Sequence, residues 1–297
     1  MRRLRKQPRN YLKKLLRSHD MMKMKTLVAA IAIAAAGTAN AAIDMANTGS
    51  SSLVLSVWDN VAQESYIRDL GLNLADITPA MITPDAGLTL NFAADPLFAS
   101  LFGNNTASDI YWNITAADST GSGSITGRQI IGTGALGALA SSFSVTNTGV
   151  ANSANYWNTF FANANTQPNV PGVDTNNCTT NTSCYSLDAG DLQYAGDTSW
   201  GTFWGQNLTG WNNAGTLGQS LGFYSFTPSS TSGFVQSTKV RYENAYGLGT
   251  WMLAANGSVT YSIASAPVST VPVPAAAWLF GTGLAGLASV ARRRVVS

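Results

Sequence analysis

The last 27 residues of the chain, 271–297, constrain its fold most strongly. A stretch punctuated by prolines leads into 17 mostly apolar residues, Ala275 to Ala291, and three adjacent arginines follow. At about 1.5 Å per helical residue, this run spans roughly 25 Å, slightly less than the hydrocarbon core of a bilayer. Because arginines flanking a membrane helix stay on the cytoplasmic side, the preceding residues are expected outside the cytoplasm. The tail therefore predicts a single C-terminal transmembrane helix on an exported protein.

The tail also resembles a known sorting signal. Its proline motif and basic end consist of Val271, Pro272, Val273 and Pro274, and of Arg292, Arg293 and Arg294. This order resembles the PEP-CTERM signal of Gram-negative bacteria, although Val273 stands where the family name implies glutamate. The resemblance implies recognition by a membrane-embedded cysteine transpeptidase of the exosortase type, removal of the helix, and delivery to the cell surface or an exopolysaccharide matrix. It covers about a tenth of the chain, and the tail without it supports only a single-span anchor.

The N-terminal end predicts export as well. Lys23 and Lys25 precede an apolar stretch, Thr26 to Ala36, that is too short to span a membrane. Ala39 and Ala41 are small residues at the two positions that signal peptidase recognises, so cleavage is predicted after Ala41. We therefore interpret residues 1–41 as a basic extension followed by a signal peptide.

The two targeting segments carry most of the positive charge. Of the 17 Lys and Arg residues, four lie between them, whereas 14 of the 15 Asp and Glu residues do. The exported body then has a net charge of about −10, which argues against nucleic acid as a partner. The eight basic residues in 1–20 exceed what a signal peptide needs, so we expect translation to start at Met21, Met22 or Met24, with a genuine extended n-region as the alternative.

Histidine is missing from the exported body, because the single one, His19, lies in the leader. This excludes hydrolases that depend on a catalytic triad or on a zinc site with histidine ligands. Glycoside hydrolysis needs only two carboxylates, yet the two glutamates, Glu64 and Glu243, are far apart and the aspartates show no local pairing. We expect no catalytic residues, metal or cofactor, and keep a secreted carbohydrate-active enzyme with two carboxylates as the alternative.

The two cysteines, Cys178 and Cys184, are predicted to form one disulfide that closes a small surface loop. A metal site would need further soft ligands, and a nucleophilic cysteine would need a histidine partner. A loop this short contributes roughly 2 to 3 kcal/mol to stability.

Residues 42–263 show short period-two alternation between clusters of Gly, Asn, Asp, Ser and Thr. This pattern predicts a mainly β fold, a β-sandwich or jelly-roll-like single domain with one or two short helices. The expected strands include Ser52–Val57, Ile110–Ala116, Leu221–Phe226 and Gln236–Tyr242. Within Thr250–Ile263, the Asn256-Gly257 pair predicts a hairpin with a two-residue type I′ turn.

Other segments depart from the strand pattern. Asp95–Gly103 has a capping residue, a proline at the first helical position and a terminal glycine, which predict a short helix. Aromatic residues at spacings of three and four predict a second helix over Ser153–Asn165 that packs on a sheet. Asn165–Asp188 is expected to be the longest irregular loop, and Ala264–Pro274 an extended stalk that presents the sorting motif.

Two groups of residues are candidate ligand sites. Trp200, Trp204 and Trp211 lie in a Gly- and Asn-rich run and could stack on sugars, although core packing is favoured for any single tryptophan. Aspartates that flank the cysteines could hold Ca²⁺, but they do not follow the EF-hand order, so solvated side chains are the favoured interpretation. These aspartates are Asp174, Asp188, Asp191 and Asp197.

Together these features predict a structural or adhesive protein that is exported, anchored transiently in the inner membrane, then released to the cell surface or outside the cell. Its expected partners are an exosortase-type enzyme, inner-membrane lipid and exopolysaccharide. A permanently anchored single-pass membrane protein is a second alternative.

Overall fold

The computed structural model describes residues 42–120, 125–136, 145–166, 175–176, 178, 183–196, 213–267, 280 and 282–284. The chain divides into two units, Met1–Ser265 and Ala266–Ser297. In the second unit, Phe280 and residues 282–284 have helical backbone. Over the described residues, no helix combines the length and apolar character needed to cross a membrane. Most of the predicted spanning run, Ala275 to Ala291, lies outside the described residues.

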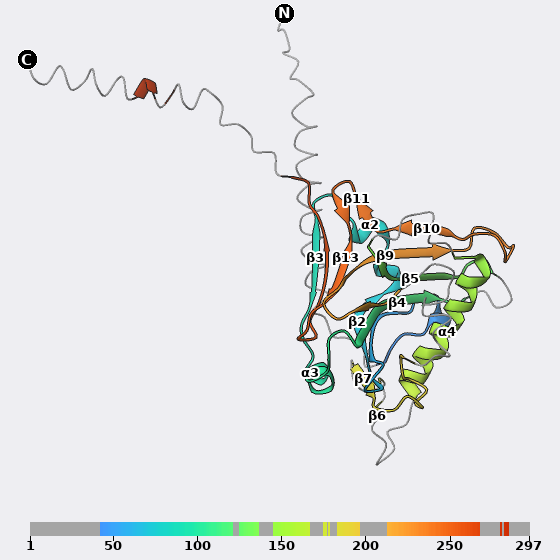
Figure 1. Ribbon diagram of the computed structural model, residues 1–297. Coiled ribbons are helices and arrows are strands. Elements are labelled where there is room, and N and C mark those ends of the chain that lie inside the picture. The colour runs from blue at the N-terminus through green and yellow to red at the C-terminus, as the bar shows by residue number, and fades with distance from the viewer. Residues whose placement is uncertain are drawn as a thin grey trace, which may run out of the picture. The chain divides into compact units, whose positions relative to one another are not determined.

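One antiparallel sheet organises the first unit (Figure 1), which confirms a mainly β fold. Twelve strands belong to this sheet within the described part of the chain. Along its main path the strands are β3 (Leu88–Phe92), β14 (Val259–Ile263), β13 (Thr250–Leu253), β9 (Ser220–Thr227), β5 (Gln129–Ala135), β4 (Ile110–Asp118), β1 (Ser52–Asp59), β2 (Glu64–Asn73), β7 (Ser183–Ser186) and β6 (Thr175–Asn176). Off this path, β10 (Thr238–Arg241) pairs with β9 and β8 (Gly215–Thr216) with β4, while β11 (Glu243–Asn244) and β12 (Gly247–Leu248) form a separate hairpin.

The sheet curls, and its inner face encloses a large hydrophobic core. Residues from strands near both ends of the path belong to this one core, including Tyr66 on β2 and Trp251 on β13. Trp251 is fully buried and contacts the rings of Phe92, Phe223 and Tyr261. The two ends of the sheet are therefore held together by a shared aromatic core.

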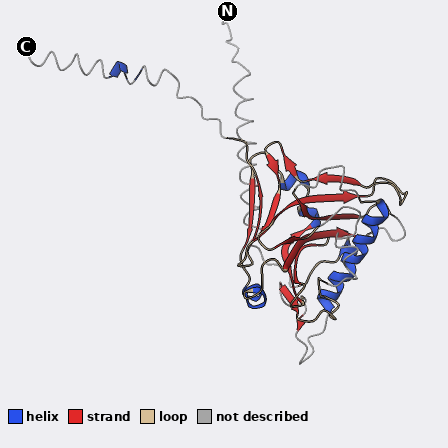
Figure 2. Cartoon of the chain, in the orientation of Figure 1, coloured by secondary structure: helices blue, strands red, loops and turns tan. Residues whose placement is uncertain are grey.

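The outer face of the sheet is covered by helix α4 (Asn147–Thr166) over β1, β4, β5 and β9 (Figure 2). Trp157, Phe160 and Phe161 of α4 belong to a second core with outward-facing strand residues such as Val54 and Phe226. Beyond β9, the outward positions of β13, β14 and β3 are exposed or half-buried. The outer face thus has a covered half and a bare half.

Both predicted helices are present. Helix α3 (Pro96–Phe102) is capped by Asp95, whose side chain accepts a hydrogen bond from the Leu97 amide, although the terminal Gly103 stays right-handed. Helix α4 has 20 residues and starts at Asn147, so the expectation of short helices was wrong for it. The described residues also contain three single-turn helical elements: η1 (Ala46–Thr48), η2 (Leu74–Asp76) and α2 (Pro79–Ile82).

The four strands expected from alternation are confirmed as β1, β4, β9 and β10. The hairpin of β13 and β14 is confirmed too, but its predicted type I′ turn is wrong. The Ala254 amide donates to the Ser258 carbonyl and the Gly257 amide to the Ala254 carbonyl, so three residues form the loop. Gly257 has a φ of 83°, whereas Asn256 does not have a positive φ. A Cβ on Gly257 would lie 2.5 Å from the Phe98 ring, so the packing of α3 also requires glycine here.

Candidate functional site

Most sequence-predicted site residues lie outside the described part of the chain. These are the cleavage residues Ala39 and Ala41, the candidate sugar contacts Trp200, Trp204 and Trp211, and the sorting residues Val271, Pro272, Val273, Pro274, Arg292, Arg293 and Arg294. Their predicted roles remain predictions. The described residues contain the disulfide, several carboxylates, a pocket and four tryptophans.

The Cys178–Cys184 disulfide is present, which confirms the predicted pairing. Both cysteines are nearly inaccessible to solvent. Residues 179–182 of the predicted surface loop between them lie outside the described part of the chain. Cys184 lies on β7 opposite Ile67 of β2, and the Cys178 amide donates to the Ala164 carbonyl near the end of α4 at 2.9 Å. The bridge therefore joins the end of α4 to the outer side of the sheet.

The predicted irregular loop Asn165–Asp188 contains two short strands, β6 and β7, where the structure describes it. β7 pairs with β2, and β6 pairs with β7, so this segment extends the sheet by two strands. Sequence reasoning missed them because each strand has at most four residues, which is too short for a readable alternation.

Asp95 connects three elements. Its Oδ1 accepts from the Leu97 amide at 2.9 Å, and its Oδ2 accepts from Tyr66 Oη at 2.9 Å and Ser183 Oγ at 2.6 Å. Burial acts to raise the pKa of Asp95, but these hydrogen bonds and the nearby Arg68 outweigh it and hold the pKa below its ordinary value. Burial raises the pKa of Tyr66 far above its ordinary value, so the phenol remains a donor. The carboxylate therefore ties α3 and β7 to β2.

Asp59 and Glu64 form a carboxylate pair at the turn between β1 and β2. The Asn105 side-chain amide donates to Asp59 Oδ2 at 3.0 Å and to Glu64 Oε2 at 3.2 Å. Asp59 Oδ1 also accepts from the amides of Val61 and Ala62, at 2.7 and 2.8 Å. Asp59 is only 2% exposed and accepts hydrogen bonds through both carboxylate oxygens. Its side chain therefore organises the turn and does not face a cleft. Sequence reasoning did not single out this pair, although the two residues flank a strand turn.

A pocket of about 190 Å³ lies elsewhere in the first unit. Its lining combines small, apolar and polar residues and includes a single carboxylate, Asp118. Asp118 Oδ1 already accepts from the Thr120 amide at 2.8 Å and from Thr120 Oγ1 at 2.6 Å. This pocket therefore lacks the two carboxylates that glycoside hydrolysis requires. The residues that line it are Gly49, Leu74, Ala75, Thr78, Pro79, Asp118, Gln129, Ile131 and Tyr242.

The aspartates near the cysteines make local hydrogen bonds. Asp188 Oδ1 accepts from the Gly190 amide at 2.8 Å, and Asp191 Oδ2 accepts from Ser186 Oγ at 2.6 Å. Asp174 and Asp197 lie outside the described residues. In the ranges that the structure describes, no three His, Cys, Asp or Glu side chains are placed to hold a metal ion.

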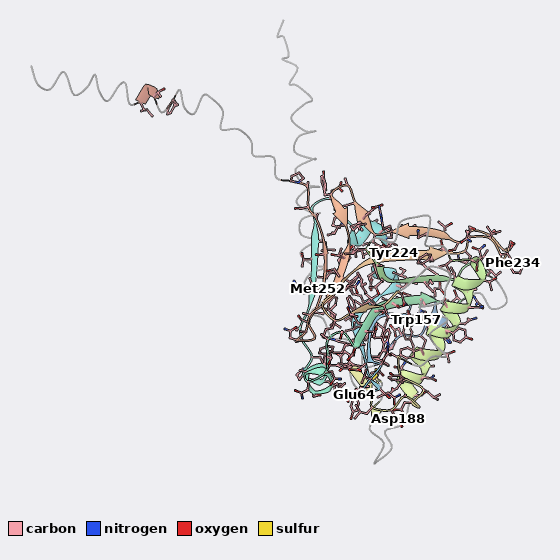
Figure 3. All side chains as sticks on the ribbon, viewed as in Figure 1. Glu64, Trp157, Asp188, Tyr224, Phe234 and Met252 are labelled. Atoms are coloured by element: carbon pink, nitrogen blue, oxygen red, sulfur yellow. A yellow bond between two sulfur atoms is a disulfide. The ribbon has the colours of Figure 1, made fainter. Side chains whose placement is uncertain are left out.

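The described tryptophans pack in the two cores, as the favoured interpretation expected. Trp112 and Trp251 are fully buried in the inner core, and Trp58 and Trp157 are at most 4% exposed in the outer one. Trp157 lies between α4 and the sheet (Figure 3). These four side chains are therefore not available for stacking on a sugar.

Comparison with known proteins finds no match to any family model, curated protein or solved structure. The function of the protein is therefore inferred from the residues of the chain itself. In the described part of the chain, the carboxylates that accept hydrogen bonds, such as Asp59, Asp95 and Asp188, serve turns, caps and strand contacts.

Proposed function

We propose that this protein is an exported bacterial protein of the cell surface or extracellular matrix. The run Ala275 to Ala291 holds it briefly in the inner membrane, and an exosortase-type transpeptidase cuts the chain near Pro272 to Pro274. The observation that carries this proposal is the order of segments in the tail: a Pro-x-Pro motif, an apolar run and three arginines. The predicted signal peptide before Ala42 directs the body across the membrane.

Two features of the body support an extracytoplasmic location. The Cys178–Cys184 disulfide suits an oxidising compartment, because thiols in the cytosol are kept reduced. The net charge of about −10 between the targeting segments keeps the body soluble and suits a protein that lies among hydrated polymers.

The molecular role that we propose is structural or adhesive, in association with exopolysaccharide. The described carboxylate pair, Asp59 and Glu64, shares one amide donor and shapes a turn, which supports a structural role for both residues. An enzyme using two carboxylates would need a pair that faces a cleft.

We also propose that the fold is a variant of the β-sandwich. One aromatic core lies between strands from the two ends of the curled sheet, as a sandwich core lies between two layers. A continuous path of hydrogen-bonded strands joins the two layers instead of separate sheets.

The sorting proposal is tested by intact mass spectrometry of the protein from culture medium and membranes, in cells with and without the sorting enzyme. The expected released form begins at Ala42, lacks residues from Ala275 onward, and disappears when the enzyme is deleted. A full-length C-terminus in the membrane under both conditions would instead establish a permanently anchored protein.

A pair of variants sharpens this test. Replacing Pro272 and Pro274 by alanine should abolish the trimmed form while export continues. Pro267→Ala, which changes a proline in the preceding stalk, should leave trimming intact. Equal trimming of all three proteins would contradict recognition of the motif.

A further inference from the structure

The bare half of the outer face presents an ordered array of polar side chains. Cross-strand pairing aligns Thr250 on β13, Ser262 on β14 and Thr89 on β3 in one row. The same pairing aligns Met252, Thr260 and Asn91 in a second row. We call these six residues the hydroxyl ladder. Neighbouring strands lie about 4.8 Å apart, and the two rows are separated by about 6.7 Å along each strand, so the ladder is a regular lattice of five small polar side chains and one methionine.

Side chains of the ladder contact one another and remain accessible. Thr250 Oγ1 and Ser262 Oγ are 3.2 Å apart, and Thr260 Oγ1 donates to Asn91 Oδ1 at 3.4 Å. Thr89 and Asn91 are exposed, and Thr250, Thr260 and Ser262 are half-buried. A hydroxyl has one donor and two acceptor positions, so these groups retain hydrogen-bonding capacity toward a ligand. Figure 3 places Met252 on the side of the sheet away from α4.

Charge distinguishes the ladder from the rest of the exported body. None of its six residues is ionisable, although the body as a whole carries about ten net negative charges. An anionic polymer would be repelled by the body and would find no cation on the ladder. Neutral hydroxyl groups match the ladder, because they can donate to and accept from Thr, Ser and Asn side chains.

An exposed aromatic residue lies next to one end of the ladder. The hairpin of β11 and β12 contacts the residue that follows β14: Asn244 Nδ2 donates to the Ala264 carbonyl at 2.7 Å, and a Cβ on Gly247 would lie 3.6 Å from the Ala264 Cβ. Tyr246, at the tip of this hairpin, is 44% exposed. Tyrosine combines a ring that stacks on apolar ring faces with a polar hydroxyl.

We propose that the hydroxyl ladder binds a neutral polysaccharide chain, with Tyr246 at its edge as a stacking residue. The inference deepens the proposed matrix association and depends on it for its biological setting. The ladder supplies repeated neutral hydrogen-bonding groups, Met252 supplies apolar contact, and the absence of charge selects against acidic polymers. Each contact is weak, so retention depends on several sugar units of one chain binding together.

The test is a pull-down of the full chain, purified in detergent, on two polysaccharide fractions from the source culture separated by anion exchange. Dextran and cellulose serve as defined neutral probes and alginate as an acidic one. We expect retention on a neutral polymer and little on the acidic polymers. The triple variant T89V/T260V/S262A should lower the apparent affinity at least about tenfold, because three neutral hydrogen bonds are removed.

Thr238→Val is the matched control, because Thr238 is an exposed threonine on β10, outside the ladder. It should bind like the wild type. Should the triple variant fold poorly by circular dichroism, Thr89→Ala at the exposed edge strand should still reduce retention. Absence of binding to every neutral polymer, retention on acidic polymers alone, or undiminished binding by folded ladder variants would overturn the proposal.

Failure of this inference can be told apart from failure of the sorting proposal. Binding is measured on the purified full chain and does not require trimming of the tail. A trimmed, released protein without polysaccharide binding would remove the ladder proposal alone. A protein that binds neutral polysaccharide but is never trimmed would remove the sorting route and leave the ladder in place.

Discussion

The two halves of the outer face use the same antiparallel pairing but present different side chains. Over the covered half, outward positions such as Val54, Ile130 and Phe226 are apolar and buried beneath α4. Over the bare half, the corresponding positions on β13, β14 and β3 are occupied by the hydroxyl ladder. The difference shows that the outward side chains, and not the strand pairing, decide where a helix can pack.

The covered half also contains polar groups whose burial is costly. Ser56 and Asn113 face each other across β1 and β4, and Thr115 follows on the same side. Their side-chain polar atoms are buried, and none has a hydrogen-bond partner among the residues that the structure describes. An unsatisfied buried polar group costs about 1–3 kcal/mol, so the aromatic packing of α4 must offset this cost.

The largest expected effect concerns the aromatic contact of α4. Trp157→Ala should lower the free energy of unfolding by about 4 kcal/mol, because it removes a buried indole and leaves a cavity. Met252→Ala on the bare half should change it by less than about 0.5 kcal/mol. Urea unfolding of both variants measures the difference. Similar losses at the two positions would erase the distinction between the halves.

Removing the disulfide should have the next largest effect. The double variant C178A/C184A should lose about 2 kcal/mol, because the unfolded chain gains the freedom of an opened loop. Wild-type protein unfolded in the presence of a reductant is the matched comparison and should show a similar loss. Unchanged stability in both experiments would show that the disulfide does not help to hold α4 on the sheet.

Asn113→Leu should act in the opposite direction. Leucine has a similar size and leaves no buried amide without partners, so the variant should be more stable by about 1 kcal/mol. Thermal and urea unfolding measure whether the free energy of unfolding rises or falls. Thr260→Leu on the bare half is the comparison and should bring no such gain. A clear loss for Asn113→Leu would mean that the amide makes favourable interactions in solution.

Asp69 on β2 should make the stability of the first unit sensitive to pH. Burial raises the pKa of Asp69 above its ordinary value of 3.8, with a contribution from Asp44, against hydrogen bonds from the Gly71 amide and Ser52 Oγ. The folded state therefore holds this proton more tightly than the unfolded state, and its stability falls as the pH rises above about 4. Asp69→Asn cannot ionise, so it should gain stability relative to the wild type from about pH 4 to pH 7.

Urea unfolding at several pH values tests this expectation. Asp85→Asn, at an exposed position, corrects for the loss of one negative charge. A difference between Asp69→Asn and the wild type that stays constant with pH would contradict the raised pKa.

The smallest effects are expected on the bare half. Thr89→Val and Thr260→Val should each change the free energy of unfolding by less than about 0.5 kcal/mol, since the positions face solvent and valine favours strands. Differential scanning calorimetry would detect a larger loss. Such a loss would assign the ladder a structural role and weaken its assignment as a binding surface.

Local patterns predicted much of this fold. Alternation identified β1, β4, β9 and β10, and the cap at Asp95 identified α3, because these signals lie within a few neighbouring residues. The sequence pattern did not predict that α4 starts at Asn147, because this start depends on residues distant along the chain. Asn147 donates to the Ser232 carbonyl at 2.7 Å and accepts from the Ser229 amide at 3.0 Å, more than 80 residues along the chain.

The candidate sites divide in the same way. The disulfide pairing followed from there being only two cysteines, yet its burial depended on the contact of Cys178 with Ala164 near the end of α4. The ladder could not be read from the sequence, because its members come from 89–91, 250–252 and 260–262 and meet only through strand pairing. The carboxylate pair of Asp59 and Glu64 likewise depends on Asn105, which lies far along the chain.

By itself, the sequence determined the strand alternation, the capped helix α3 and the cysteine pair, and it predicts the export and sorting segments, because each signal is local or compositional. The tertiary structure alone decided which outward positions lie beneath α4 and which remain bare. It also decided that the Asn256-Gly257 hairpin has a three-residue loop, since Gly257 packs against Phe98. These outcomes depend on contacts between residues distant along the chain, which no local pattern encodes.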